Sequence, residues 1–527
     1  MKCLQIILDH SLPTKVILWE GEHFQDITFP EQKATELLNY LANLYPDDIL
    51  LWHDSSLTPY VKPISIVKLL SGPFDVLHCS GLFRYESQLA TLGYVDFSSS
   101  FLLLKGNTRY PSWLVTSQIG VTYAALFQIL KLRTDCGFMQ SLLEWGYEGQ
   151  KHGFCCYSEP ILFSSGYHLY EEISKLSNVI QLNQVQLIKR IYGLKWVWFW
   201  VLAIILDKKQ MNFLSLFRAI FSLTPKPFVF NQKLLEERIN SYSLKNICEE
   251  SNIKSVDVIL PTLGRLDHLR NVLLDLSGQT VLPNRVVIIE QIPPDLTWPA
   301  ISLDYEQEYP FEIVKKIVHW TGVCRARNLG LSICNSKWVL FLDDDIRFGD
   351  KFIEDLISGV NLYKVQAINE CTYQLTQPIP NPEPMQIWHT FGGGVGLVER
   401  ELAVKAGGFD EKIIGYGEDG EFGVRLRKVG SHILYTTNSP VLHLKAERGG
   451  FRFTKLPWFS EKIKPRPSPT VLYALLKHNT TQMNCGFQLF TFIKRIRSVC
   501  LLKWLPEYQL AKQQWLACIY WASWLAN

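Results

Sequence analysis

The sequence predicts an α/β fold with a largely parallel sheet for the second half of the chain. A strand pattern at 256–260 is broken by Pro261 and Gly264, and leucines then recur at helical spacing from 266 to 276. A second strand pattern follows at 285–291. A helical pattern at 322–336 then leads into the apolar run 338–342. Strands and helices that alternate in this way are typical of parallel sheets with helical connections.

Acidic side chains stand where two of these predicted strands end. Glu290 closes the run 285–291, and three consecutive aspartates, Asp343 to Asp345, follow the run 338–342. Because the carboxyl ends of parallel strands share one rim, where ligands bind, we expect these acids to lie on the same side of the sheet. Adjacent carboxylates repel one another and are costly to desolvate without a cation. The pattern therefore predicts a cation site.

A glycine-rich segment at 392–396 precedes a further helical pattern that starts at about Glu418. Its apolar positions recur with helical spacing on one face, at Phe422, Leu426 and Val429. Glu418 and Asp419 stand at its first turn, where the helix dipole favours negative charge. The strand pattern that follows carries His443.

Composition limits the class of protein. The chain has 527 residues, too many for one ordinary domain, and is 47% hydrophobic and 20% charged, as expected for a globular protein. A net charge of +3 does not suggest a nucleic-acid partner. The twelve cysteines form no CxxC ladder, which argues against a zinc or disulfide framework and favours a reducing compartment. At the N-terminus a short apolar run is interrupted by Asp9, so no signal peptide is predicted.

The first half of the chain contains a weak echo of the second half. A strand pattern within 47–56 ends in one acid, Asp54. Three spaced residues of a later helical pattern match three of the second half: Phe138, Leu142 and Gly146 against Phe422, Leu426 and Gly430. Most of the chemistry is absent in the echo. In that alignment Thr134 replaces Glu418 and Phe163 replaces His443. We therefore expect a degenerate copy without a metal site.

These patterns predict four regions. They are a degenerate α/β domain at 1–180, a helical connector at 181–250, the α/β domain at 251–455 and a helical tail at 456–527. Within the connector, residues 196–206 are apolar but shorter than the roughly 20 residues that cross a bilayer, so we expect a buried or interfacial helix. The tail is rich in Trp, Lys and Arg. Both peripheral contact with a membrane surface and ordinary helix packing are open for it.

Four motifs in the second half resemble those of glycosyltransferase family 2, the nucleotide-sugar-dependent enzymes of GT-A fold. Between residues 255 and 452 they occur in the order of that family: "VILPTLGR", "GVCRARNLGL", "LDDD", and "GGFDE" followed by "GYGEDGEF". The resemblance implies a GT-A domain, Rossmann-like with a mostly parallel sheet.

The resemblance also implies roles for individual residues. In the DxD pattern, Asp343 and Asp345 would bind Mn²⁺ or Mg²⁺, with His443 as a further ligand. Asp419 would be the general base, and Glu418 would orient the acceptor or exchange roles with it. The nucleotide sugar, by default a UDP-sugar, would contact a set of residues that precedes or includes the acidic cluster: Pro261, Thr262, Arg265, Glu290, Arg327 and Asp343.

The predicted function is metal-dependent, inverting transfer of a sugar to a hydroxyl of a glycan or lipid-linked acceptor in surface polysaccharide synthesis, at the cytoplasmic face of a membrane. A nucleotidyltransferase is the first alternative, but the segment "PTLGRLDH" lacks the lysine and the glycines that such enzymes carry in their opening loop. A non-catalytic scaffold is the second alternative, which the four intact acids of the second half disfavour.

Overall fold

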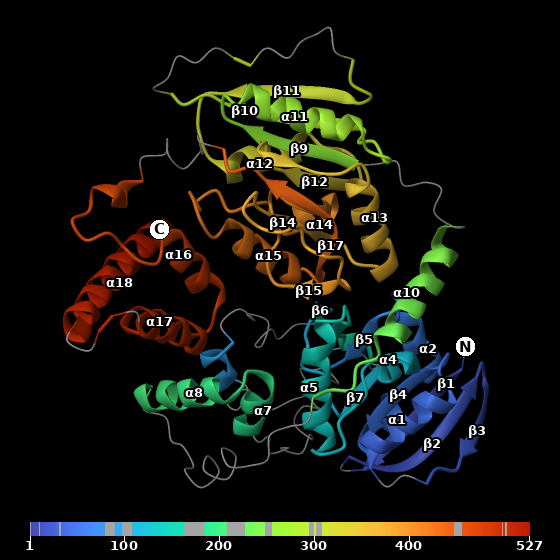
Figure 1. Cartoon of the computed structure of the whole chain (residues 1–527). Helices are drawn as coiled ribbons and strands as arrows, with labels where there is room; N and C mark the ends of the chain where they lie inside the picture. Colours follow the sequence, from blue (N-terminus) through green and yellow to red (C-terminus); the bar gives the residue numbers. More distant parts are fainter. Residues whose placement is uncertain are drawn as a thin grey trace. The chain divides into compact units, whose positions relative to one another are not determined.

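The structure of the protein, a computed structural model, divides the chain into two units that are described separately (Figure 1). The first consists mainly of residues 1–249 and the second mainly of residues 250–527, while segments 362–364 and 480–487 group with the first. The structure describes residues 2–9, 11–30, 33–79, 90–96, 108–162, 184–207, 227–247, 256–294, 300–301, 308–446, 456–497, 499–500 and 503–527.

The second unit is built on a mixed sheet with strand order β11-β10-β9-β12-β16-β14-β17-β13, and β15 pairs with β17. The first four strands are mutually parallel, β16 is antiparallel to both of its neighbours, and β14 is parallel to β17. The strands are β9 (Val256–Thr262), β10 (Arg285–Gln291), β11 (Glu312–Val318), β12 (Trp338–Leu342), β13 (Ile346–Arg347), β14 (Ala367–Tyr373), β15 (Gln386–Trp388), β16 (Val395–Glu399) and β17 (Ile433–His443).

Helices connect these strands. They are α11 (Leu266–Ser277), α12 (Val323–Ile333), α13 (Phe352–Tyr363), α14 (Arg400–Lys405) and α15 (Glu418–Lys428). The sequence pattern predicted three of them, α11, α12 and α15. The helix α12 packs on β9 and β10. The predicted strands 285–291 and 338–342 have those same bounds, and the α/β prediction is confirmed.

The strand β9 runs past Pro261, where the sequence predicted a break. Pairing between β12 and β9 ends at Ile259, so the missing N–H of Pro261 removes no hydrogen bond on that side. On the other side Pro261 still lies opposite Ile289 of β10. The extension carries Thr262 to the rim of the sheet.

The first unit contains a sheet of order β3-β2-β1-β4-β7-β5-β8-β6. Its strands are β1 (Cys3–Asp9), β2 (Leu12–Glu20), β3 (His23–Ile27), β4 (Ile49–Asp54), β5 (Asp75–His78), β6 (Tyr110–Pro111), β7 (Ile119–Tyr123) and β8 (Cys155–Ser158). Its longer helices are α1 (Ala34–Leu44), α4 (Ala124–Ile129), α5 (Phe138–Gln150), α7 (Gln184–Ile191), α8 (Leu194–Leu206) and α10 (Gln232–Ile247).

The two sheets repeat one another in order and direction from β1 and β9 onward. In both, a parallel neighbour (β4 or β12) is followed by an antiparallel strand (β7 or β16) and then by a parallel pair. An aromatic residue faces a glycine across the same strand pair, Trp52 opposite Gly120 and Phe341 opposite Gly396. The echo in the sequence therefore corresponds to a repeated topology.

The first unit differs from the second in its acidic residues and on one side of its sheet. Asp54 lies two residues after Trp52, as Asp343 lies two after Phe341, but its carboxylate accepts hydrogen bonds from the Ser56 N–H and hydroxyl. Antiparallel hairpins β1-β2-β3 stand where the second unit has the parallel strands β9, β10 and β11. Phe163, predicted to replace His443, lies outside the described residues.

The predicted connector and tail are helical where the structure describes them. The helix α8 buries Val197, Trp200 and Val201, whereas Trp198 and Ile205 are more than half exposed. The tail forms α16 (Pro469–His478), α17 (Thr481–Ile496) and α18 (Trp504–Ala526). Within the described ranges, no helix combines the length and the apolar character that crossing a membrane requires.

A buried aspartate ties the loop before β12 to β9. The Asp257 carboxylate is fully buried and accepts hydrogen bonds from the Asn335 N–H (2.8 Å), the Ser336 N–H (3.0 Å) and the Ser336 hydroxyl (2.7 Å). A buried carboxylate with three donors fixes the start of β12, and through it the acidic cluster at the end of that strand.

We expect Asp257→Ala to lower the free energy of unfolding by about 2–4 kcal/mol, because the buried N–H of Ser336 and the partly buried N–H of Asn335 lose their acceptor. The midpoint of urea unfolding, followed by circular dichroism, measures the effect. The exposed Asp350 is the control, since Asp350→Ala removes no side-chain hydrogen bond that the structure shows and should change stability by less than about 0.5 kcal/mol. Equal midpoints for the two variants would contradict the expectation.

Candidate active site

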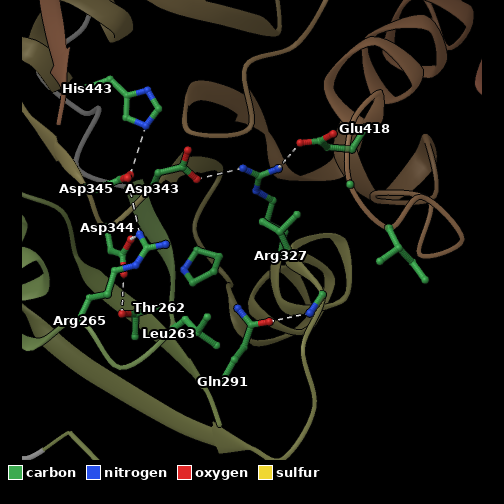
Figure 2. A pocket seen from close by; sticks show the side chains of 15 residues that line it. Thr262, Leu263, Arg265, Gln291, Arg327, Asp343, Asp344, Asp345, Glu418 and His443 are labelled. Carbon is green, nitrogen blue, oxygen red and sulfur yellow. Dashed lines mark hydrogen bonds and ion pairs between the residues drawn. The ribbon is translucent and has the colours of Figure 1, made fainter. Parts of the chain in front are cut away.

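A cleft of about 250 Å³ lies at the carboxyl ends of β9, β10 and β12 in the second unit (Figure 2). Most residues predicted from the sequence line it: Pro261, Thr262, Arg265, Arg327, Asp343, Asp345, Glu418 and His443. Glu290 and Asp419 are not among the lining residues. Asp344, Leu263, Gln291, Gly322, Val323, Ile414 and Gly415 complete the wall.

The strand pairing of β13 with β17 assembles a group that could hold a metal ion. Ile346 pairs with His443, so Asp345, one residue earlier, lies beside the imidazole, with Oδ1 3.4 Å from Nε2. Ligand atoms of Asp343, Asp345 and His443 all lie within 4.8 Å of one another. Two carboxylates and an imidazole form a donor set that suits Mn²⁺ or Mg²⁺. The predicted metal ligands therefore meet.

Hydrogen bonds keep Asp345 ionised. Burial alone would raise its pKa, but His443 and the Ala446 N–H, which donates to Oδ2 at 2.9 Å, lower the pKa to about 2. The hydrogen bond to Asp345 in turn raises the pKa of His443, against the opposing effect of burial. A carboxylate that is ionised at any working pH is a suitable metal ligand.

The middle aspartate turns away from the presumptive metal group and anchors the first loop. Asp344 is buried and accepts hydrogen bonds from the Thr262 hydroxyl (2.6 Å) and Arg265 Nη1 (2.5 Å). Burial raises the pKa of Asp344 to about 6, although Arg265 and Thr262 oppose the shift. Thr262 and Arg265 are thereby fixed at the rim of the cleft, with their own polar atoms directed to Asp344.

Arg327, from the first turns of α12, links the two sides of the cleft. Its Nη2 donates to Asp343 Oδ1 at 3.1 Å, and its Nη1 lies 3.9 Å from Glu418 Oε1 and 3.7 Å from Asp419 Oδ1. The residue is only 3% exposed, and its Nε and Nη1 have no hydrogen-bond partner among the described residues. Burial alone would lower the pKa of Arg327, but the three acids raise it. A buried cation with unused donors is suited to bind an anion.

Glu418 and Asp419 begin α15 and repel one another. Burial, then the charge of Asp419, raises the pKa of Glu418 to about 7. Removal from bulk water also raises the pKa of Asp419, although Arg327 and the Gly393 N–H, which donates to Oδ1 at 3.0 Å, oppose the shift. The Asp419 side chain is 43% exposed and that of Glu418 15%. Carboxyl groups with raised pKa values can accept a proton near neutral pH.

The glycine-rich segment contributes contacts that the sequence analysis did not assign. A Cβ on Gly394 would lie 2.3 Å from Asp343 Oδ2, and one on Gly393 would lie 2.4 Å from Arg327 Nη1. The Gly394 carbonyl also accepts the Asp343 N–H at 3.2 Å. Only backbone without side chains can approach the two functional groups this closely. The run "GGG" was visible in the sequence, but its contacts were not.

Glu290 does not lie where the prediction needs it. Its carboxylate accepts the Ile301 N–H at 2.7 Å and pairs with Lys315 at 2.6 Å, on the side of β10 away from the cleft. Its neighbour Gln291 lines the cleft instead and accepts the Gly322 N–H at 2.8 Å, at the start of α12. Successive side chains of a strand point to opposite faces, so a shift of one residue exchanges the two roles.

Comparison with known proteins assigns the second half to a family. Residues 257–369 match the family model described as glycosyl transferase family 2. A protein from Haemophilus influenzae described as an uncharacterized glycosyltransferase is 23% identical over 203 residues, which cover 36% of this chain and 67% of the relative.

Solved structures with partial similarity include TarS of S. aureus, residues 1–349, in complex with UDP-GlcNAc. It shares 13% identity and a TM-score of 0.36 over 50% of this chain and 81% of that structure. GalNAc-T7 with UDP, GalNAc and Mn²⁺ shares 12% identity and a TM-score of 0.33 over 49% of this chain and 55% of that structure. The assignment rests on the family match and on the motifs within it. The second half of this chain contains a glycosyltransferase family 2 domain.

Proposed function

We propose that the protein transfers a sugar from a nucleotide-sugar donor to a hydroxyl of a glycan or lipid-linked acceptor, with a divalent metal ion and inversion at the anomeric carbon. One observation carries the proposal. A single cleft joins Asp343, Asp345 and His443 to the unsatisfied guanidinium of Arg327 and to the acidic turn at Glu418. Glycosyl transfer from a nucleoside diphosphate requires a bound cation, a group that binds the phosphate anion and a proton acceptor.

The donor side of the cleft would bind the nucleotide sugar. Asp343, Asp345 and His443 would hold Mn²⁺ or Mg²⁺, which when bound neutralises charge on the departing diphosphate. The free donors of Arg327 would bind a phosphate oxygen. Pro261, Thr262 and Arg265 would line the nucleotide pocket, with uridine as the default base. Glu290 faces away from the cleft, so Gln291 is the better candidate at that position.

The acceptor side would supply the base. Asp419 is the more exposed acid of the pair, and because Gly393 binds only Oδ1, the other oxygen can receive the proton of the acceptor hydroxyl. Glu418, which lines the cleft, would orient the acceptor or share that proton. With base and leaving group on opposite sides of the sugar, a single displacement inverts the anomeric centre.

Residues of the first unit would not bind a donor. Two serines follow Asp54 where Asp344 and Asp345 follow Asp343, and the parallel strands that position the donor loop are replaced by hairpins. We propose a structural role for this unit, as a degenerate copy of the catalytic domain. The nucleotidyltransferase alternative is disfavoured by the family match and by the short loop after β9, which holds one glycine and no lysine.

We expect Asp345→Ala to abolish Mn²⁺-dependent binding of UDP. Loss of a direct ligand should weaken it by about 100-fold or more, since even outer-shell changes cost 10–100-fold. Isothermal titration with UDP and Mn²⁺ should give one site per chain for the unchanged protein and none for the variant. Asp54→Ala, at the position of the first unit that matches Asp343, is the control and should retain that single site. Two sites per chain, or an unaffected Asp345→Ala, would refute the assignment.

The rate should fall in acid as the acidic turn takes up a proton. A raised pKa means that Asp419, the proposed base, retains its proton to higher pH than an ordinary aspartate, so the base form is lost as the pH decreases through that raised pKa. We expect Mn²⁺-dependent release of UDP from UDP-sugars to drop about tenfold per pH unit below that value. Glu418→Gln should move the acid limb to lower pH because it removes the repulsion acting on Asp419, whereas Asp419→Asn should eliminate turnover. If the acid limb of the rate profile stays at the same pH in Glu418→Gln, the proposed repulsion between Glu418 and Asp419 does not affect the base.

We also propose that α18 contacts a membrane surface that carries the acceptor, on the cytoplasmic side where nucleotide sugars are available. Its exposed apolar side chains recur along the helix: Leu505, Tyr508, Leu516, Ile519, Tyr520 and Trp524. Lys503 and Lys512 of this segment are exposed, as are Lys494 and Arg497 near the end of α17. An apolar stripe with flanking cations suits an anionic lipid surface.

Replacing two residues of that stripe, Leu516→Glu with Ile519→Glu, should weaken binding to vesicles with anionic lipid by at least about tenfold, since each apolar side chain contributes roughly 1.5–3 kcal/mol when buried. Co-sedimentation with vesicles containing phosphatidylglycerol measures it. The matched control is Leu375→Glu with Ile379→Glu, two residues that are also strongly exposed but lie outside the tail. If neither pair changes sedimentation, α18 is not the contact.

A further inference from the structure

The helix α16, which follows the catalytic domain in sequence, is bonded along its length to the acceptor side of the cleft. The segment 410–417 and the start of α15 supply Ile414, Gly415 and Glu418 to the cleft wall. The Thr470 hydroxyl donates to the Tyr416 carbonyl at 2.7 Å, and a Cβ on Gly417 would lie 3.3 Å from the Val471 Cα. Near the other end of the segment, the Tyr473 hydroxyl donates to Asp410 Oδ2 at 2.9 Å.

The strongest link is a buried carboxylate on α15. The Glu421 side chain is fully buried, two residues after Asp419, and accepts hydrogen bonds from Lys477 Nζ and His478 Nε2 of α16, both at 2.9 Å. Arg425, which like Glu421 is on α15, also donates to the Glu421 carboxylate, from Nε at 2.8 Å and from Nη2 at 2.6 Å. Burial alone would raise the pKa of Glu421, but His478 and Arg425 lower it to about 2. The carboxylate is therefore ionised and fully used by its partners.

The two basic residues of α16 each reach a second partner. Lys477 Nζ also donates to Asp410 Oδ2 at 2.7 Å, so one ammonium joins the loop to the helix. His478 Nδ1 lies 2.9 Å from Lys428 Nζ. Since an ammonium can only donate, Nδ1 accepts and Nε2 carries the proton given to Glu421. Both ends of α15 are thereby bonded to α16, and so is the loop before it.

Contacts from α12 hold the same loop from another element. Asn328 donates to the Phe409 carbonyl at 2.8 Å and accepts the Phe409 N–H at 2.7 Å. Because α12 also carries Arg327, the donor side has its own support. Within the part of the chain that the structure describes, the donor groups on β9, β12, α12 and β17 bond to one another and not to α16. In the described residues, α16 therefore bonds to the acceptor side of the cleft and not to the donor side.

We propose that Lys477, His478 and Glu421 are positioning residues, through which α16 holds the acceptor loop and the first turn of α15 in place for the transfer reaction. This inference rests on the proposed function of the cleft. Displacements on the order of 1 Å at a general base cost about 100-fold in rate. The tail is then part of the catalytic apparatus and not only an appended element.

Lys477→Met is the informative variant, because Lys477 is 36% exposed and its removal leaves the Arg425 bonds to Glu421 in place. In the full-length protein, hydrogen exchange of peptides covering 410–421 should become at least about tenfold faster, with no change in peptides covering β9 and β12. Lys477→Arg should restore slow exchange. Unchanged exchange in 410–421, or equally faster exchange throughout the second unit, would overturn the inference.

Two solution measurements separate this inference from the proposed function. Titration of Lys477→Met with UDP and Mn²⁺ should give the dissociation constant of the unchanged protein, while Mn²⁺-dependent release of UDP from UDP-glucose should fall about tenfold or more. Loss of UDP binding in the variant would overturn the positioning role. Absence of UDP release from the unchanged protein with every UDP-sugar would overturn the proposed function and leave the exchange result to decide the inference.

Glu507→Gln is the matched control. It breaks the ion pair between Arg495 of α17 and Glu507 of α18, in which Nε and Oε2 are 2.9 Å apart. Both residues are in the tail and partly exposed, and they lie on α17 and α18, not on α16. Exchange in 410–421 and UDP release should both be unchanged in this variant. The same losses as in Lys477→Met would show that any weakening of the tail suffices, and would overturn the specific role of the α16 residues.

Discussion

Compensation of three carboxylates at the end of one buried strand determines the arrangement of this site. The strand β12 is fully buried and delivers Asp343, Asp344 and Asp345 together. Each has a partner: the guanidinium of Arg327 for Asp343, the guanidinium of Arg265 for Asp344 and the imidazole of His443 for Asp345. The partners come from three different elements, so the charge balance requires that α12, the loop after β9 and the end of β17 converge. The sheet and the cleft must therefore form together.

Much of this was accessible from the sequence because burial and strand direction follow from apolar patterning. The bounds of β10 and β12 and the start of α15 follow from runs and spacing alone. The meeting of Asp345 with His443 was implied only by family resemblance, since it depends on a two-residue strand, β13, that no periodicity could indicate. Glu290 was assigned to the cleft because a strand pattern gives its end but not which face its last residue presents.

Contacts made by backbone or by distant helices could not be predicted in this way. Gly393 and Gly394 act through the absence of a side chain, and their partners Arg327 and Asp343 are far away in sequence. The bonds of Lys477 and His478 to Glu421 connect the tail to α15, and the sequence of two amphipathic helices does not indicate which charged residues will pair between them. The sequence did indicate Glu421 as an acid of the motif, but the reason for its burial lies in α16.

The repeated topology of the two units shows how little of the sheet the chemistry needs. Both sheets keep the central parallel pair, the antiparallel strand and the glycine opposite an aromatic residue. The second unit alone has parallel strands with helical connections on the other side, and these supply Thr262, Arg265 and Arg327. Without them, the aspartate at the equivalent position of β4 forms no ion pair with any described residue and caps a turn with Ser56. The sheet is the scaffold common to both units, and the function depends on the cations that the connections bring to its rim.

Arg327 also links the two sides of the cleft that we propose bind the donor and the acceptor. It is within 4 Å of Asp343 on one side and of Glu418 and Asp419 on the other. A unit-charge pair at that separation interacts by about 4 kcal/mol at an effective dielectric constant of 20. An anion that occupied the free Nη1 and Nε donors would draw on the same positive charge that now lowers the proton affinity of the acidic turn. Glu418 and Asp419 would then hold a proton more firmly, so a filled donor side would make the acceptor side a stronger base.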